Sequence, residues 1–268
     1  MNETFRALLE EAQFTYEILG NGVTMLGKAN YATKGLYFSA YTSLSTGLER
    51  IGKLCIMLDF YIKHFGTFPN ESEIRTIGHD LRVLYDKSQE MIKENDLEFE
   101  FLNSYTDKLH FEILSILNSF AKGDRYSNIN ILTNSNRKSD PIKSWHEIDI
   151  FLFENRVSKK KKEKIRYNAE IIGQLMSPFS IVRHSNESRE DITDPETASF
   201  QTGVYEAVSK YRQLYVLQII RYWVEILREL QYKAMKIGKQ EIPFFSKIFA
   251  SFFNSDSYFL TRKTFDKL

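Results

Sequence analysis

Apolar residues recur at three- and four-residue steps along most of this chain, and this spacing constrains the fold more than any other feature. Near the start of the chain the steps place Phe5, Leu8, Ala12 and Tyr16 on one face of a helix. With 12 Gly and 5 Pro among 268 residues, turn-forming residues are too few for a strand-rich fold. The sequence therefore predicts an all-α fold, a helical bundle with additional peripheral helices.

Capping residues and helix breakers indicate where the helices begin and end. Asn2 can cap the first helix, Gly20-Asn21-Gly22 can end it, and Asp80 can cap a helix at 81–94. Further helices are expected at about residues 31–65, 71–76, 97–121, 142–176, 205–235 and 243–253. Polar loops are expected at residues 126–141 and 187–202. We expect one domain over residues 1–268, with a core from about 30 to 235 and an aromatic helix near its end.

Composition excludes several classes of protein. The 36 Lys and Arg balance 35 Asp and Glu, so binding to nucleic acid or a membrane would need a local patch. Cys55 is the only cysteine, which excludes an internal disulfide and a zinc site built from cysteines, and is typical of a reducing cytoplasm. Residues 1–11 lack the apolar stretch of a signal peptide, and no run of about 18 apolar residues could span a membrane. The scattered His residues and the lack of a phosphate-binding glycine loop predict no metal and no cofactor.

A small group of charged residues interrupts the apolar helix expected at 31–65. Glu49 and Lys53 are four residues apart, so they lie on one face of the helix and can form an ion pair. Gly78-His79-Asp80-Leu81 then opens the next helix. Two interpretations are open: a surface ion pair with His79 bonded to nearby backbone, or a polar cluster in a groove of the bundle.

Two other polar groups lie near expected loops. Arg183 and His184 precede a polar segment that contains Asn186, and Arg125 and Asn128 lie in an Asn-rich segment. Such side chains either bond the backbone of their own loop or bind a ligand.

The order of these motifs resembles that of the HEPN superfamily, whose helical domains are associated with nucleotides and RNA. In that family a helix with an L-E-x-x-x-K-like pattern, here Leu48 to Lys53, is followed by a turn similar to Gly78-His79-Asp80-Leu81. A later Arg, which Arg183 matches, precedes a His by a few residues. The resemblance implies a HEPN-like bundle, RNA or a nucleotide as ligand, and a homodimer in which paired motifs form one cleft.

The chain departs from the HEPN pattern at one point. No His follows His184, so Arg183 has no His at the family spacing. The resemblance implies that the Arg of a HEPN ribonuclease steadies a phosphate while the His acts as general acid or base. Either His184 takes this role from the adjacent position or the site is not catalytic. On a helix, adjacent side chains point about 100° apart, so His184 could not easily take the position of the family His. In a loop this restriction on the direction of the His184 side chain would not apply.

Lysine and phenylalanine are each concentrated in one segment. The run Lys159 to Lys162 is expected to be a solvated helix face, with a phosphate-binding patch as the alternative. The Phe-rich helix at 243–253 is expected to pack on its own bundle, with a subunit interface or a membrane surface as alternatives. The large number of aromatic residues and the HEPN resemblance together predict a homodimer.

Three hypotheses follow from the sequence. The first is a non-catalytic HEPN-like module that binds RNA, a nucleotide or a partner protein in a groove lined by Glu49, His79, Arg183 and His184. The second is a metal-independent endoribonuclease of the toxin or antiviral-defence type that uses Arg183 and His184, and the third is a helical scaffold without a ligand. The candidate ligand-binding residues are Glu49, Lys53, His79, Arg125, Asn128 and Asn186.

Overall fold

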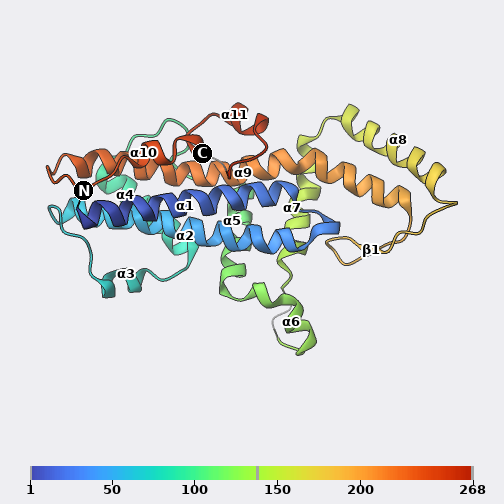
Figure 1. Cartoon of the computed structure of the whole chain (residues 1–268), viewed down its shortest axis with the longest axis horizontal. Helices are drawn as coiled ribbons and strands as arrows, with labels where there is room; N and C mark the ends of the chain where they lie inside the picture. Colours follow the sequence, from blue (N-terminus) through green and yellow to red (C-terminus); the bar gives the residue numbers. More distant parts are fainter. Residues whose placement is uncertain (1, 137–138, 267–268) are drawn as a thin grey trace.

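The structure is a computed structural model that describes residues 2–136 and 139–266. Three long helices lie side by side and form its body, α1 (Glu3–Lys28), α2 (Gly35–Lys63) and α9 (Pro195–Met235) (Figure 1). The shorter helices are α3 (Glu71–Ile77), α4 (Leu81–Asn95), α5 (Lys108–Lys122), α6 (Ser127–Leu132), α7 (Pro141–Arg156), α8 (Lys159–Met176), α10 (Phe245–Ile248) and α11 (Asp256–Thr261). Single 3-10 turns are η1 (Tyr31–Thr33), η2 (Asp124–Tyr126) and η3 (Ala250–Phe252).

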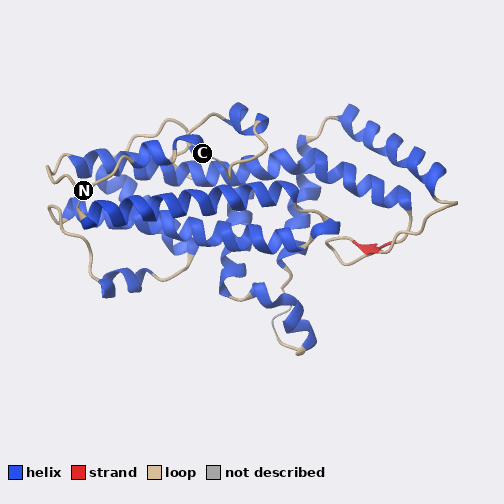
Figure 2. Ribbon diagram, in the orientation of Figure 1, coloured by secondary structure: helices blue, strands red, loops and turns tan. Residues whose placement is uncertain are grey.

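Helix dominates the described residues, which confirms the all-α prediction. The strands among the described residues are β1 (His184–Ser185) and β2 (Asp191–Ile192), which pair antiparallel in a small hairpin (Figure 2). α4, α5, α7 and α8 pack against the long helices, whereas α3 and α6 extend outward from them (Figure 1).

α9 is the central helix of the core. From Arg212 to Leu227 every residue except Gln218 is buried, so this part of α9 contacts protein on all sides. α1, α2, α7, α10 and α11 all pack on α9. The N-terminal part of α9 instead reaches beyond the bundle and pairs with α8 (Figure 1).

Two predicted N-caps are confirmed. The Asn2 side chain accepts a 2.7 Å hydrogen bond from the backbone N–H of Phe5. The Asp80 side chain accepts from the backbone of Arg82 at 2.8 Å and starts α4. Both caps are local contacts, and the sequence therefore contains the information that specifies them.

The prediction that Gly20-Asn21-Gly22 ends α1 is wrong, because Gly20 and Gly22 lie where other segments approach this helix closely. A Cβ atom on Gly20 would lie 2.1 Å from the backbone oxygen of Phe265, and one on Gly22 would lie 2.7 Å from Leu44. The missing side chains allow neighbouring segments to approach α1, which continues to Lys28.

Two predicted helices are shorter than expected because other contacts fix their ends. The predicted helix 97–121 begins only at Lys108, since the carboxylate of Glu225 binds the backbone N–H groups of residues 100–102 and holds them in a loop. The predicted helix 142–176 is divided at Ser158, whose side chain caps α8. α9 extends into the predicted loop 187–202, because Asp194 caps it at Pro195.

The aromatic C-terminal segment packs on its own bundle. Residues 243–253 form the short α10 and η3 rather than one helix, and α11 follows. Phe245, Phe249 and Phe252 are buried, and Phe249 and Phe252 contact the ring of Tyr16 on α1. In the part of the chain that the structure describes, no helix is long and apolar enough to cross a membrane.

Candidate functional site

The predicted site residues lie in two separate regions. Glu49, Lys53 and His79 lie at the middle of α2, whereas Arg183 and His184 belong to the hairpin segment beside the start of α2. At about 1.5 Å per residue, the helix carries Glu49 roughly 22 Å away from Lys34, which touches the hairpin. The prediction of one groove lined by residues of both groups is therefore wrong.

The residues around Glu49 neutralise one another. Glu49 Oε1 accepts hydrogen bonds from Lys53 Nζ and from His79 Nδ1, both at 2.7 Å. The neighbouring Arg50 is paired with Glu11 at 2.5 Å. The ion pairs Glu49–Lys53 and Glu11–Arg50 line a largely apolar cavity of about 650 Å³ between α1, α2 and the segment that contains α3, whereas His79 does not line it. The arrangement agrees with the simpler sequence interpretation in its ion pair beside the core, but the expectation for His79 is wrong, because its ring bonds the Glu49 carboxylate rather than nearby backbone.

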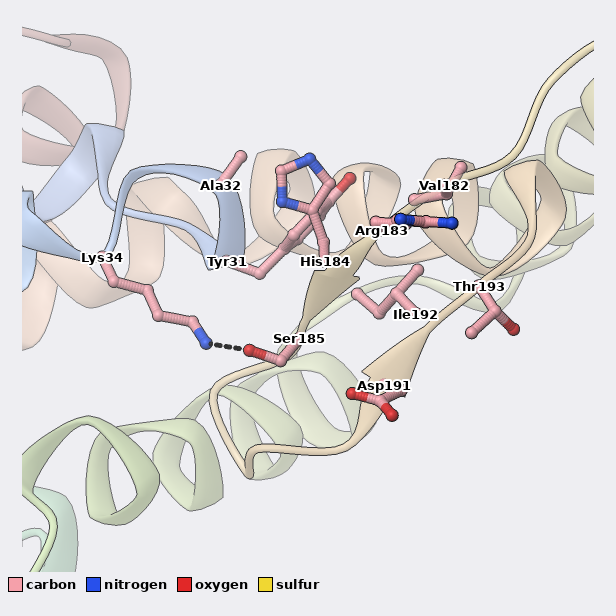
Figure 3. A pocket seen from close by; sticks show the side chains of 10 residues that line it. All are labelled: Tyr31, Ala32, Lys34, Val182, Arg183, His184, Ser185, Asp191, Ile192 and Thr193. Carbon is pink, nitrogen blue, oxygen red and sulfur yellow. Dashed lines mark hydrogen bonds between the residues drawn. The ribbon is translucent and has the colours of Figure 1, made fainter. Parts of the chain in front are cut away.

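The hairpin and η1 form a second cavity, of about 640 Å³ (Figure 3). Its lining residues are Tyr31, Ala32, Lys34, Val182, Arg183, His184, Ser185, Asp191, Ile192 and Thr193. His184 lies edge-on to the ring of Tyr31, with 5.6 Å between the ring centroids. Arg183 and His184 thus line one cavity from a strand and the loop before it, so the geometry of a helix does not govern their relative directions.

Two cations of this cavity have no carboxylate partner among the described residues. The exposed Arg183 side chain makes no hydrogen bond or ion pair within residues 2–136 and 139–266. Lys34 Nζ donates to Ser185 Oγ and to the backbone oxygen of Asn186, both at 2.8 Å and both neutral (Figure 3). Asp191 is the one carboxylate among the residues that line the cavity, so its walls carry net positive charge.

The hairpin turn is held by its own side chains and by α6 and α7. The Asn186 side chain donates to Glu190 Oε2 at 2.7 Å and accepts from the Glu190 N–H at 2.8 Å. Arg189 donates to Asp140 Oδ2 at 2.9 Å and to Asn128 Oδ1 at 3.3 Å. The amides of Asn186 and Asn128 therefore make structural contacts here. Asn128 also lines an adjoining cavity of about 650 Å³, which shares Lys34, Ser185 and Asp191 with the first.

Arg125 lies apart from both groups. Its guanidinium is 5.2 Å from the ring centroid of Tyr126 and is exposed on η2. Arg125 does not line either of the two cavities at the hairpin.

A buried network of polar side chains connects the hairpin to the core of the bundle. Glu187, in the turn between β1 and β2, is only 2% exposed. Its carboxylate accepts hydrogen bonds from the hydroxyls of Tyr37, at 3.2 Å, and Tyr205. Burial and the nearby Glu187 carboxylate raise the pKa of Tyr205, and burial raises the pKa of Tyr37, so both phenols remain protonated donors.

Beneath these tyrosines lies an ion pair in the core. Arg212 donates to Asp149 through Nε at 2.6 Å and through Nη2 at 2.5 Å. The two side chains are 0% and 1% exposed. Arg212 also donates to the backbone oxygen of Ala29 at 2.7 Å and to the hydroxyl of Tyr37 at 3.0 Å. The network therefore connects the ion pair, through Tyr37, to Glu187 of the hairpin.

Sequence reasoning did not identify Tyr31, Lys34, Asp191 or Glu187. Lys34 and Ser185 are 151 residues apart in the chain, and no local pattern relates them. The one available signal was a lysine and an aromatic residue directly before a long apolar helix. Among the described residues, no three His, Cys, Asp or Glu side chains gather in a geometry that could hold a metal ion.

Comparisons with other proteins do not identify a family for this chain. No family model, no curated protein and no solved structure matches the chain. The resemblance to the HEPN superfamily therefore depends on the short sequence motifs around Glu49, His79 and Arg183 alone.

Proposed function

We propose that this protein is a HEPN-like module that binds a phosphate-bearing ligand, RNA or a nucleotide, in the cavity between η1 and the hairpin, without catalysing a reaction. The observation that supports this most strongly is the exposed Arg183 guanidinium, which has no partner among the described residues and faces a cavity. A planar guanidinium can bind two phosphate oxygens at once. Lys34 adds a second positive charge that neutral oxygens hold in place.

Two further features of the cavity suit such a ligand. α2 begins at Gly35 without a side-chain cap, so the positive end of a 29-residue helix opens beside Lys34. The rings of Tyr31 and His184 supply an aromatic surface against which a base can stack. The cavity thus combines positive charge for a phosphate with flat rings for a base.

The second candidate function is a metal-independent endoribonuclease. The observation that favours it is that Arg183 and His184 line the same cavity, even though they are adjacent in sequence. Cleavage of RNA needs a group that takes a proton from the 2′-hydroxyl and a group that protonates the leaving oxygen. His184 is the one imidazole in this cavity, so binding without cleavage is the function that the geometry supports better.

We also propose that the protein forms a homodimer and acts in the cytoplasm. The dimer is supported by the HEPN resemblance and by large apolar side chains that lie exposed on α8. The single buried Cys55 agrees with a reducing compartment.

The test is binding of a fluorescently labelled single-stranded RNA and of ATP, measured by fluorescence anisotropy with a chelator present. We expect Arg183→Ala to weaken binding by roughly 10- to 100-fold, since it removes charged hydrogen bonds to phosphate. Rising salt should weaken the binding of RNA to the wild type. The matched control is Arg166→Ala, which removes an exposed cation on α8 outside the cavity.

Two outcomes would contradict the proposal. Equal affinity of wild type and Arg183→Ala for both ligands would exclude this cavity as the binding site. Cleavage of RNA that disappears in both Arg183→Ala and His184→Ala would replace the binding module with the ribonuclease.

A further inference from the structure

α8 buries only one narrow side of its surface. Its buried residues are Ile165, Ala169 and Gly173, which follow one another at four-residue steps and pack on α9. The contact is close, because a Cβ atom on Gly173 would lie 2.8 Å from Glu196 of α9. Of the other residues of α8, Lys162 and Ile171 are half-buried and the rest are exposed.

The opposite side of α8 carries a second apolar stripe. Tyr167, Ile171 and Leu175 each come two residues after a buried residue, which places them about 200° around the helix. Tyr167 is 63% exposed and Leu175 is 62% exposed. Beyond the helix, the apolar side chains of Phe179 and Ile181 are more than four-fifths exposed. A helix that faced only solvent on this side would carry polar residues there.

The charges of α8 oppose its own helix dipole. Its first turn is rich in lysine and has no acidic residue, although the N-terminal end of a helix favours negative charge. Its last turn has no basic residue, although the C-terminal end favours positive charge. Lys162 is held by Glu154 at 2.7 Å, whereas Lys160 and Lys161 have no carboxylate partner among the described residues. Each end of α8 therefore lacks the opposite charge that would stabilise it.

We propose that α8 is the surface through which two copies of this chain pair, antiparallel, about a two-fold axis near Ile171. This inference rests on the proposed homodimer. In this arrangement Tyr167 packs against Leu175 of the partner subunit, and Ile171 lies against its own copy. The lysine-rich start of each α8 then lies beside the negative C-terminal end of the other. A parallel pair would instead bring the two lysine-rich ends together.

The charge pattern favours a second copy over a membrane. A helix that lies on an anionic membrane has basic residues along its length beside the apolar face. On α8 most of the basic residues lie at the start of the helix, while Ile171 and Leu175 lie towards its end. An antiparallel copy of the same helix meets both features at once.

The first experiment is multi-angle light scattering and sedimentation of the full chain over a range of concentrations. We expect a dimer for the wild type and a roughly 10- to 100-fold weaker dimer for Leu175→Glu, because a charge then replaces a central apolar contact. The double variant Tyr167→Lys with Leu175→Glu should restore the dimer, since antiparallel pairing places each new lysine beside a new glutamate. Circular dichroism confirms that every variant keeps its helical content.

The second experiment is oxidative cross-linking. Ile171→Cys should form a disulfide between two chains, because the two new thiols meet at the axis. Arg166→Cys, on another side of α8, is the matched control and should not cross-link. The native Cys55 is buried and does not interfere.

Four results would overturn the proposal. A wild type that stays monomeric at every concentration would exclude the homodimer itself. A dimer that Leu175→Glu does not weaken would place the interface elsewhere and leave the homodimer intact. A double variant no more dimeric than Leu175→Glu, or equal cross-linking of Arg166→Cys and Ile171→Cys, would exclude the antiparallel arrangement.

Discussion

Replacing Arg212 tests whether the buried network stabilises the core as the structure indicates. The guanidinium is fully buried and makes two hydrogen bonds of 2.5 and 2.6 Å to Asp149. Arg212→Met keeps most of the side-chain volume but leaves the Asp149 carboxylate buried without a counter-charge. It also leaves the backbone oxygen of Ala29 without its 2.7 Å donor.

The size of the effect follows from what remains buried. Removing one partner of a buried ion pair costs about 3–5 kcal/mol, mainly because the other charge stays desolvated and unpaired. For a chain of this size each kcal/mol lowers Tm by roughly 2–4 °C, so Arg212→Met should lower Tm by about 6–20 °C. The double variant Arg212→Met with Asp149→Leu removes both charges and should recover most of this loss.

The assay is urea unfolding followed by circular dichroism, with calorimetry for Tm. The matched control is Arg75→Met, which breaks the exposed pair with Glu71, where both side chains are more than three-quarters exposed. Its free energy of unfolding should change by less than about 1 kcal/mol. If the double variant is as unstable as Arg212→Met alone, the unpaired carboxylate is not the cause of the loss and the reasoning is refuted.

Three further predictions concern single groups. Hydrogen bonds from Thr197 lower the pKa of Asp194, the cap of α9, below its ordinary value of 3.8. The stabilisation by the ionised cap is therefore present above pH 3.8 and is lost as the pH falls below this value, so Asp194→Ala should cost about 1 kcal/mol of folding stability at neutral pH and less in acid. Urea titrations at both pH values would show the difference. Burial lowers the pKa of His110 below 6.5, so the wild type should lose stability as the pH falls below 6.5 more steeply than His110→Gln, and parallel pH–stability curves would contradict this. Glu187→Gln should speed amide hydrogen exchange of residues 184–192, because the hydrogen bonds of a carboxylate to two phenols are weakened; unchanged exchange would show that the hairpin does not depend on Glu187.

The helices could be predicted because their signals are local. The N-caps Asn2 and Asp80 lie within three residues of the N–H groups that they bind. The pair Glu49–Lys53 follows from the four-residue period of a helix and forms at 2.7 Å. Such contacts need no knowledge of the rest of the fold.

The errors arose where a distant contact outweighed a local preference. Residues 97–107 have the apolar pattern of a helix, but Glu225 of α9 binds the N–H groups of residues 100–102 and holds them in a loop. Gly20 and Gly22 have the composition of a helix end, but they allow Phe265 and Leu44 to pack closely against α1. A single sequence contains no signal for either contact, since the partners lie far along the chain.

The candidate site was only half predictable for the same reason. Arg183 was identified because it matches part of a motif, and His184 because it is adjacent to Arg183 in the chain. Lys34 and Tyr31 complete the cavity from a segment that becomes its neighbour only when α1, α2 and α9 have packed. The division of the predicted groove into two regions likewise follows from the length of α2, which the residue types alone do not show.

The position of the buried polar network supports a functional role for the hairpin end of the bundle. A well-packed apolar cluster in place of Arg212 and Asp149 would be equally or more stable, so stability alone does not explain a buried charge network. This one lies directly beneath the hairpin and reaches Glu187 through Tyr37. Locally unfavourable choices in a natural sequence tend to lie at sites that require a defined geometry. Here the element that receives a defined geometry is the short hairpin segment that presents Arg183 to the cavity, which is the geometry that the proposed binding function requires.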